Sequence, residues 1–434
     1  MGKKLLVPII MMFMFTPISF LSADPTYVET ASEIPSIKID WNRTYGGAGD
    51  QSGYAMIQTV DGGFAIAGQS LSSGMNGSQV MVVKTNASGH EQWNYRFGGN
   101  QVIGESANGL TQTSDGGFVL TGWTVSLAVQ NETTDSYTGD VLLVKIDGSG
   151  KEVWKRTFGG TDWDWANEII ETVDGGFLLG GCTNSYGAGE ADFWIIKTDS
   201  NGLEEWNYTL GGPTRDFCDS LIETRDRGFA LSGSSGDDLW LVKVDASVNQ
   251  QWDQRLGGGN RDIGTSVIQT EEGGFVVAGV ISGNFDYRDA WLVKIDSSGN
   301  VEWSQTYGDS PVAEAHSVIQ TADGGFAFAG YSQEDVDVYA DTDLYVVKTD
   351  ASGSEEWNYT VGGTGEAFGR SIVQTANGTF VIGGSRSSNS NTDTDMWLIK
   401  VTLIPRSSVS TNLPGHFFIL SAGILALVRR KRLK

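Results

Sequence analysis

Hydrophobic and polar residues alternate with a period of two along most of the chain, in short runs separated by glycine-containing turns. One unit of this pattern has runs at 317–321, 326–330, 344–348 and 357–361, with tight turns at 323–325 and 350–353. Alternation of this length predicts β-strands, and a tight turn between two such runs predicts an antiparallel hairpin. The unit therefore predicts four short antiparallel strands.

This unit recurs seven times, as three columns of residues show independently. Tryptophan recurs at Trp41, Trp93, Trp154, Trp206, Trp252, Trp303 and Trp357. Phenylalanine recurs at Phe64, Phe118, Phe177, Phe229, Phe275, Phe326 and Phe380, each with a threonine five residues earlier. Lysine recurs at Lys84, Lys145, Lys197, Lys243, Lys294, Lys348 and Lys400. Repeated units of roughly 40–60 residues with four strands each predict propeller blades, which stack around a central axis because one sheet cannot bury both faces alone.

The two ends of the repeat array complement each other. The first tryptophan strand, 41–45, precedes any complete unit, whereas the last unit stops after its third strand at Val401. If the N-terminal strand completes the C-terminal blade, the ring closes by hydrogen bonds and leaves no open sheet edge. The predicted fold is therefore all-β, a closed seven-bladed β-propeller of four-stranded blades over residues 38–404.

The segments outside this array predict export and membrane tethering. Residues 1–23 combine a basic start, an apolar run and a small residue before Asp24, which is typical of a secretory signal peptide, and 24–37 forms a linker. A Ser/Thr linker, 405–413, leads to an apolar segment with a basic end, 414–434. This segment predicts either a membrane anchor or a sorting tail, and the positive-inside rule leaves the propeller outside the cell.

Charge and sequons agree with an extracellular location. The formal net charge of −24, without a Lys/Arg-rich stripe in the repeats, excludes nucleic acid as a partner. Glycosylation sequons begin at Asn42, Asn76, Asn86, Asn131, Asn207, Asn358 and Asn377, which is compatible with a glycoprotein.

Two sequence blocks and the tail resemble known families. The stretch 344–357, L-Y-V-V-K-T-D-A-S-G-S-E-E-W, resembles the hairpin of the quinoprotein-like propeller repeat. The D-G-G-F and L-V-K-x-D blocks resemble a group of uncharacterised secreted archaeal and bacterial repeat proteins. The Leu413-Pro414-Gly415 start of the tail, with its apolar run and basic end, resembles archaeal C-terminal sorting signals. These resemblances imply the propeller fold and a location outside the cell.

Catalytic motifs do not stand out in this sequence. Residues present in every unit, such as the lysine column and the D-G-G turns, are best explained by blade structure. G-x-S-x-G, Walker and H-E-x-x-H motifs are missing, and His90, His316 and His416 are the only histidines. We therefore expect no cofactor and no metal site. By family resemblance a quinone would need an adjacent cysteine pair, and Cys182 and Cys218 are far apart, so a quinoprotein-type dehydrogenase is a distant alternative.

The positions that break the repeat are the candidate ligand-binding residues. Most lie in the connections that enter the first strand of each unit, and further candidates are the insertions 125–139 and 333–342. The selected residues are Asp162, Trp163, Asp164, Trp165, Arg215, Asp216, Arg261, Asp262, His316, Glu366 and Arg370. Tryptophan beside carboxylates suits stacking on sugars or a protein hot spot, whereas Trp163 and Trp165 could instead cover the end of a blade interface.

The predicted function is that of a surface-tethered, non-enzymatic binding or scaffold module for a glycan or a cell-envelope protein. A carbohydrate-active hydrolase or lyase that uses carboxylates such as Asp164 and Asp216 is the alternative, and a structural surface-layer role is a third. Cys182 and Cys218 fall near the same rim of adjacent units. They could form a disulfide in an oxidising setting, or remain two buried free thiols.

Overall fold

The structure is a computed structural model that describes residues 36–72, 77–98, 102–126, 138–284, 287–335, 341–387 and 393–404. All of these residues belong to one compact unit that begins at Pro35. Every regular element among them is a β-strand, so within the described ranges there is no helix that could span a membrane. The predicted signal peptide, residues 24–35 of the first predicted linker, the second linker and the tail lie outside the described residues, as do Asn76, Asn131 and parts of the two insertions. Residues 36 and 37 were predicted as linker but belong to the first strand, Ser36–Tyr45.

The strands form five antiparallel sheets of four strands and one sheet of eight. The first sheet contains β2 (Gly49–Gln58), β3 (Phe64–Ser72), β4 (Gln79–Thr85) and β5 (Glu91–Phe97). The second contains β6 (Val102–Gln112), β7 (Phe118–Ser126), β8 (Gly139–Ile146) and β9 (Glu152–Phe158). The third contains β10 (Asp164–Glu171), β11 (Phe177–Thr183), β12 (Asp192–Thr198) and β13 (Glu204–Leu210). The fourth contains β14 (Asp216–Glu223), β15 (Phe229–Ser235), β16 (Asp238–Val244) and β17 (Gln250–Leu256).

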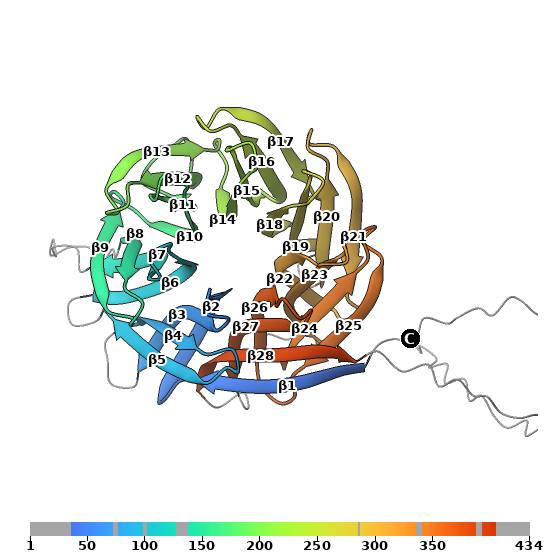
Figure 1. The fold of residues 1–434 in the computed structure, drawn as a ribbon. Coiled ribbons are helices and arrows are strands. Elements are labelled where there is room, and N and C mark those ends of the chain that lie inside the picture. The colour runs from blue at the N-terminus through green and yellow to red at the C-terminus, as the bar shows by residue number, and fades with distance from the viewer. Residues whose placement is uncertain are drawn as a thin grey trace, which may run out of the picture. The chain divides into compact units, whose positions relative to one another are not determined.

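The remaining strands complete the ring. The eight-stranded sheet contains β18 (Ile263–Gln269), β19 (Phe275–Asn284), β20 (Tyr287–Ile295), β21 (Val301–Tyr307), β22 (Val312–Gln320), β23 (Phe326–Gln333), β24 (Thr342–Thr349) and β25 (Glu355–Val361). The last sheet contains β26 (Ala367–Gln374), β27 (Phe380–Ser387), β28 (Thr394–Ile404) and β1 (Ser36–Tyr45). Figure 1 shows the sheets arranged radially, with β10, β14, β18, β22 and β26 towards the centre and β5, β9, β17 and β1 at the rim. This arrangement is a β-propeller.

The expectation of seven separate sheets needs correction. Strands β20 and β22 form one parallel pair, Arg288 with Val312, and the amide of Arg288 donates to the carbonyl of Pro311. This single link joins β18–β21 and β22–β25 into one sheet. Isolated parallel bridges join other neighbouring sheets in the same way, as between Ser78 and Gly104.

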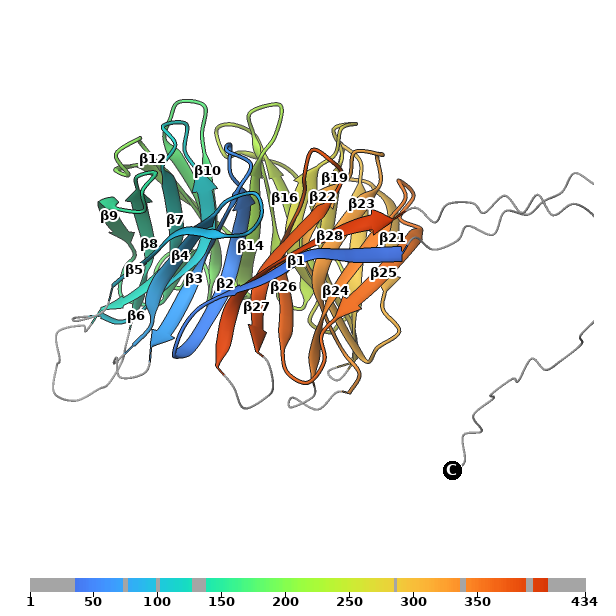
Figure 2. The same cartoon turned by 60° about the horizontal axis from the view of Figure 1, so that its bottom comes forward.

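The N-terminal strand completes the C-terminal sheet, as the sequence predicts. Strand β1 runs antiparallel to β28 from Ser36 opposite Ile404 to Tyr45 opposite Met396, and Figure 2 shows the two strands side by side. The indole nitrogen of the fully buried Trp397 on β28 donates to Asn42 Oδ1 on β1, at 2.6 Å. Thus β1 replaces the fourth strand that the last unit lacks.

The conserved columns of the repeat hold the sheets together. In six places a tryptophan of one four-strand unit packs on the column phenylalanine of the next unit, with ring centroids 5.5–6.0 Å apart. Five column lysines form ion pairs of 2.8–3.1 Å with the aspartate of the turn before the column phenylalanine, which is D-G-G in four units and Asp226-Arg227-Gly228 in the fifth. At Asp174, hydrogen bonds from Thr172, a turn amide and Lys197 lower the pKa to about 2 despite partial burial. The structural interpretation of these repeated residues is confirmed.

Candidate functional site

Each innermost strand carries a β-bulge at the same step of the repeat, five residues before the column threonine. The pairing of the first and second strands of each unit skips one residue, and the skipped residues are Tyr54, Asn108, Asn167, Asp219, Thr265, His316 and Arg370. A bulge adds an unpaired residue and re-aims its side chain. We call these seven residues the bulge ring. Their chemical types differ, whereas the residues around them repeat.

A glycine on the second strand makes each bulge possible. Gly181 lies opposite Ala166, and a Cβ at Gly181 would stand 2.1 Å from the carbonyl oxygen of Trp165. Gly330 lies opposite Ala315, and there the corresponding distance to Glu314 O is 1.8 Å. The bulge pushes a backbone carbonyl into the space that any larger residue would occupy. The same contact recurs at Gly68, Gly122, Gly233, Gly279 and Gly384.

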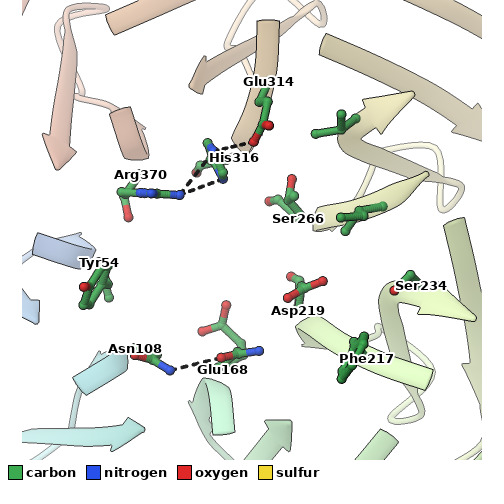
Figure 3. Close-up of a pocket in the computed structure, with 18 of the residues that line it drawn as sticks. Tyr54, Asn108, Glu168, Phe217, Asp219, Ser234, Ser266, Glu314, His316 and Arg370 are labelled. Atoms are coloured by element: carbon green, nitrogen blue, oxygen red, sulfur yellow. Dashed lines mark hydrogen bonds and ion pairs between the residues drawn. The ribbon is translucent and has the colours of Figure 1, made fainter. Parts of the chain in front are cut away.

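The bulge ring surrounds a central cavity of about 1050 Å³. All seven of its members line this cavity, which we call the channel, together with Glu168, Glu314, Trp165, Phe217 and two further arginines, Arg261 and Arg288. Figure 3 shows Glu168 and Asp219 on one side of the channel and His316 and Arg370 on another. The channel is therefore a polar cavity with carboxyl groups on one wall and a histidine and an arginine on another.

Several ring residues also bond to the next sheet, which fixes their orientation. Asn108 Nδ2 donates to Asn167 Oδ1 at 3.1 Å, and Asn167 Nδ2 donates to the carbonyl of Cys218 at 2.8 Å. Within the eight-stranded sheet, Thr265 Oγ1 on β18 donates to the carbonyl of Ala315 on β22 at 2.6 Å. Because these bonds link neighbouring four-strand units, the polar groups in the channel are positioned by the scaffold itself.

Two carboxyl groups, Glu168 on β10 and Asp219 on β14, form the acidic wall of the channel. Both residues are half-buried, and burial raises the pKa of each carboxyl group to about 7, with the charge of Arg261 acting in the opposite direction on Asp219. Among the described residues, Glu168 has one hydrogen-bond partner, the backbone amide of the adjacent Ile169, which donates to Glu168 Oε1 at 3.2 Å. Near neutral pH, each group can therefore either donate or accept a hydrogen bond.

The opposite wall is a cluster centred on Glu314, which is 8% exposed. Glu314 forms an ion pair with Arg288 and lies 3.4 Å from His316 Nε2. Burial would raise the pKa of Glu314, but His316 and Arg288 lower it to about 2. Burial and the charge of Arg370 lower the pKa of His316, so its imidazole is neutral at pH 7.

Arg370 extends this cluster into the channel. Its Nη1 donates to the His316 ring at 3.2 Å, and its guanidinium carbon lies 5.3 Å from the centroid of Phe368. The ring of Tyr331 stacks on the imidazole of His316, with the two ring centroids 5.5 Å apart. Among the described residues, no carboxylate forms an ion pair with Arg370, so this positive charge is not neutralised by a direct partner.

Three of the carboxylates selected from sequence lie outside the channel. Asp164, Asp216 and Asp262 are each 0% exposed and accept hydrogen bonds from the backbone of the preceding turn. Asp164, for example, accepts from the amide of Gly160 at 2.9 Å and from Ser185 Oγ at 2.7 Å. These side chains cap turns and are not available to a ligand.

Among the other selected residues, Trp165, Arg261, His316 and Arg370 line the channel. The remaining four do not: Asp162, Arg215 and Glu366 are exposed, and Trp163 is 37% exposed. Arg215 is paired with Glu190.

Trp163 lines a smaller cavity of about 300 Å³ with Trp123 and Trp165. The ring of Trp163 packs against Trp123 with centroids 6.3 Å apart. Asn108 and Asn167 line both this cavity and the channel, so the two adjoin. Trp163 therefore lies beside the channel, whereas Trp165 lines both cavities.

The two cysteines meet across neighbouring sheets as free thiols. Both are buried, and the amide of Cys218 donates to Cys182 Sγ at 3.2 Å. Burial raises the pKa of both thiols. Within the described residues, no group of three or more His, Cys, Asp or Glu side chains is placed to hold a metal ion.

The sequence pattern did not point to Glu168, Asp219, Tyr54, Asn108 or Asn167. Regular alternation places such residues inside an ordinary strand, where nothing in the sequence distinguishes them from other polar residues of the repeat. The available signal was a strand-interior glycine in every unit, since glycine in a strand often marks a bulge. A second signal was the column five residues before the threonine, which is the position where chemical type changes from unit to unit.

Comparisons with known proteins show only distant likenesses. No family model matches the chain, and no curated protein matches it. Sqt1 from Chaetomium thermophilum is 13% identical over 82% of this chain and 88% of that chain, with a TM-score of 0.47. Puromycin hydrolase is 10% identical over 81% of this chain and 52% of its own, with a TM-score of 0.49. A structure of YCF48 bound to D1 peptide is 10% identical over 87% and 100%, with a TM-score of 0.47. Likenesses at this level carry no argument about the function of this chain.

Proposed function

We propose that this protein is a non-enzymatic binding module that receives a hydroxyl-rich ligand, a saccharide unit, in the channel. The observation that carries the proposal is the bulge ring. Each inner strand directs one residue of individual type into a single cavity, while the repeated residues around it hold the blades together. Ligand sites combine a largely preformed cavity with a few fixed polar groups, and the channel has both.

The chemistry of the channel suits hydroxyl groups. Amides at Asn108 and Asn167 and carboxyl groups at Glu168 and Asp219 supply both donors and acceptors, which a sugar hydroxyl requires. Trp165 and Phe217, with centroids 5.9 Å apart, add aromatic surface on the same wall. Aromatic side chains of this kind pack against the apolar faces of sugar rings, while the polar groups select orientation.

The proposal includes a seven-bladed ring. The two halves of the eight-stranded sheet, β18–β21 and β22–β25, repeat the four-strand order of the other sheets and meet at one parallel pair. Counting each half as a blade gives seven units, each contributing one bulged residue. The proposal also places the ring outside the cell, tethered by its C-terminal tail, and makes a glycan or glycosylated envelope protein the natural partner; the signal-like N-terminus and basic C-terminus support this part.

A titration of the purified full-length protein with a panel of mono- and oligosaccharides tests the binding function. Isothermal titration calorimetry should detect at least one saccharide that binds the wild type. Glu168→Ser should weaken that binding by about tenfold, because the loss of one hydrogen bond to a ligand costs on the order of 1.4 kcal/mol. The equivalent position in other inner strands is Ser220, Ser266, Ser317 or Ser371, so serine is compatible with the fold there.

Asp162→Ser is the matched control, since Asp162 is an exposed carboxylate on the neighbouring loop. It should bind like the wild type. If no saccharide binds, or if Asp162→Ser weakens binding as much as Glu168→Ser, the channel is not the binding site and the proposal is wrong.

A second candidate function, hydrolysis of a glycosidic bond, rests on Glu168 and Asp219. A carboxyl group whose pKa lies near 7 can serve as a general acid or base at neutral pH. In this case the catalytic pair would be these two residues and not Asp164 and Asp216, which cap turns. Release of new reducing ends from a bound polysaccharide, abolished by both Glu168→Gln and Asp219→Asn, would favour hydrolysis. Binding without product would favour the binding module.

A further inference from the structure

One of the arginines that line the channel has no carboxyl group as a direct partner. Arg261, Arg288 and Arg370 line the channel together with three carboxyl groups, those of Glu168, Asp219 and Glu314. Glu314 forms an ion pair with Arg288, and the charge of Arg261 acts on the carboxyl group of Asp219. Among the described residues, Arg370 forms no ion pair with a carboxylate.

The backbone of β26 and two neighbouring rings hold the side chain of Arg370 in position. It is the bulged residue of β26, so the backbone directs it into the channel. Phe368 lies under its guanidinium and the neutral His316 receives one of its N–H groups, at 3.2 Å. The remaining N–H groups have no partner among the described residues. A guanidinium is a planar fork that matches an oxyanion with two parallel hydrogen bonds.

We propose that the ligand of the channel is an acidic saccharide, whose carboxylate or sulfate group is bound by Arg370 while its hydroxyl groups face Glu168 and Asp219. This inference rests on the proposed saccharide-binding function and specifies its ligand class. Figure 3 shows the two groups of residues on different sides of the channel, so one ligand can meet both. Glu314 forms an ion pair with Arg288, whereas Arg370 has no ion-pair partner among the described residues and is the arginine to which we assign the anionic group.

The test compares three saccharides that differ only at C6, where two of them carry an anionic group and the third carries a neutral hydroxyl group. The full-length protein is titrated at pH 7 with the methyl glycosides of glucuronic acid, glucose 6-sulfate and glucose. We expect at least one of the two anions to bind about 10- to 100-fold more tightly than glucose, which is the range of one charge-assisted hydrogen-bonded contact. The anion that binds more tightly shows whether the channel prefers a carboxylate or a sulfate group.

The variant Arg370→Gln removes the charge and keeps a planar amide. It should lower the affinity for the anions by the same factor and lower the affinity for glucose much less. Arg370→Lys keeps the charge without the planar fork, so its affinity for the anions should lie between those of the wild type and Arg370→Gln, which separates the contribution of the charge from that of the guanidinium geometry. Arg386→Gln is the matched control, because Arg386 lies on the same sheet with its guanidinium carbon 5.3 Å from the Trp397 ring centroid and does not line the channel. It should leave all three affinities unchanged, and melting temperatures show that each variant is folded.

Two results would overturn the inference and have different meanings. If glucose binds as tightly as both anions, or Arg370→Gln binds the anions like the wild type, the acidic class is wrong and the saccharide-binding function stands. If none of the saccharides binds at all, the proposed function fails and this inference fails with it.

Discussion

Removing the strand that closes the ring is the perturbation whose effect follows most directly from the structure. Deletion of residues 24–46 eliminates β1, and β28 then loses the nine residue pairs that run from Ser36 to Tyr45. The backbone of β28 becomes an open edge at which another chain can pair. We therefore expect both a loss of stability and aggregation.

The size of the effect can be estimated from two contacts. Tyr45 is 5% exposed and its hydroxyl donates to the carbonyl of Gly89 at 2.6 Å. The loss of one buried aromatic side chain costs about 3–5 kcal/mol. The indole N–H of Trp397 also loses its acceptor, Asn42, and a buried polar group left unpaired costs about 1–3 kcal/mol. Together these losses approach the whole stability of an ordinary domain, about 5–15 kcal/mol.

Differential scanning calorimetry and light scattering on the deletion variant and the parent measure this effect. The variant should melt far below the parent or aggregate at room temperature. A milder pair of variants supplies the control: Asn42→Ala removes the Trp397 acceptor across the closure, and Asn207→Ala removes the acceptor of Trp194, at 3.1 Å, inside a continuous sheet. The two should cost similar free energy. A deletion variant that melts like the parent would refute closure by β1.

Three further predictions concern the interior of the ring. The pKa of Glu168 and of Asp219, about 7 in the folded protein, lies above the ordinary values of 4.5 and 3.8, so the folded state binds more protons than the unfolded state. The free energy of unfolding should therefore fall as pH rises from about 4 to about 7, by on the order of 1–3 kcal/mol per group, and stay constant above pH 7. Melting curves of Glu168→Gln should show a smaller pH dependence than those of the wild type. A pH dependence equal to that of the wild type would contradict the assignment. Asp164→Ala should destabilise the protein by about 1–3 kcal/mol in urea unfolding without changing its affinity for saccharide, because Asp164 caps a turn. A variant that is as stable as the wild type but binds saccharide more weakly would show that Asp164 contacts the ligand. Cys182 and Cys218 should react with a thiol reagent only after unfolding, as two free groups per chain, whereas no reaction without prior reduction would indicate a disulfide.

Most of the fold could be predicted from the sequence because it repeats local signals. The alternation of hydrophobic and polar residues predicted the strands, and the D-G-G turns predicted the hairpins. The missing fourth strand of the last unit predicted the pairing of β1 with β28. The joining of β20 to β22 could not be predicted. It depends on one parallel contact between Arg288 and Val312, where two sheets approach at their ends, and no local pattern encodes that distance.

The candidate site was predicted only in part, and the reason is the bulge. His316, Arg370, Arg261 and Trp165 stood out because they interrupt the repeat near the start of an inner strand. Glu168 did not, because regular alternation places it on the same face as the buried Ala166. The bulge at Asn167 shifts this alternation by one residue, so that Ala166 and Ile169 are both 1% exposed and Glu168 faces the channel.

A crystal structure of the full-length protein bound to a glucuronate-containing oligosaccharide tests the central claim most directly. The account predicts the sugar inside the channel, with its carboxylate on Arg370 and its hydroxyl groups within hydrogen-bond distance of Glu168 and Asp219. A sugar bound only at the outer loops, for example against Trp163, with the channel empty, would contradict it.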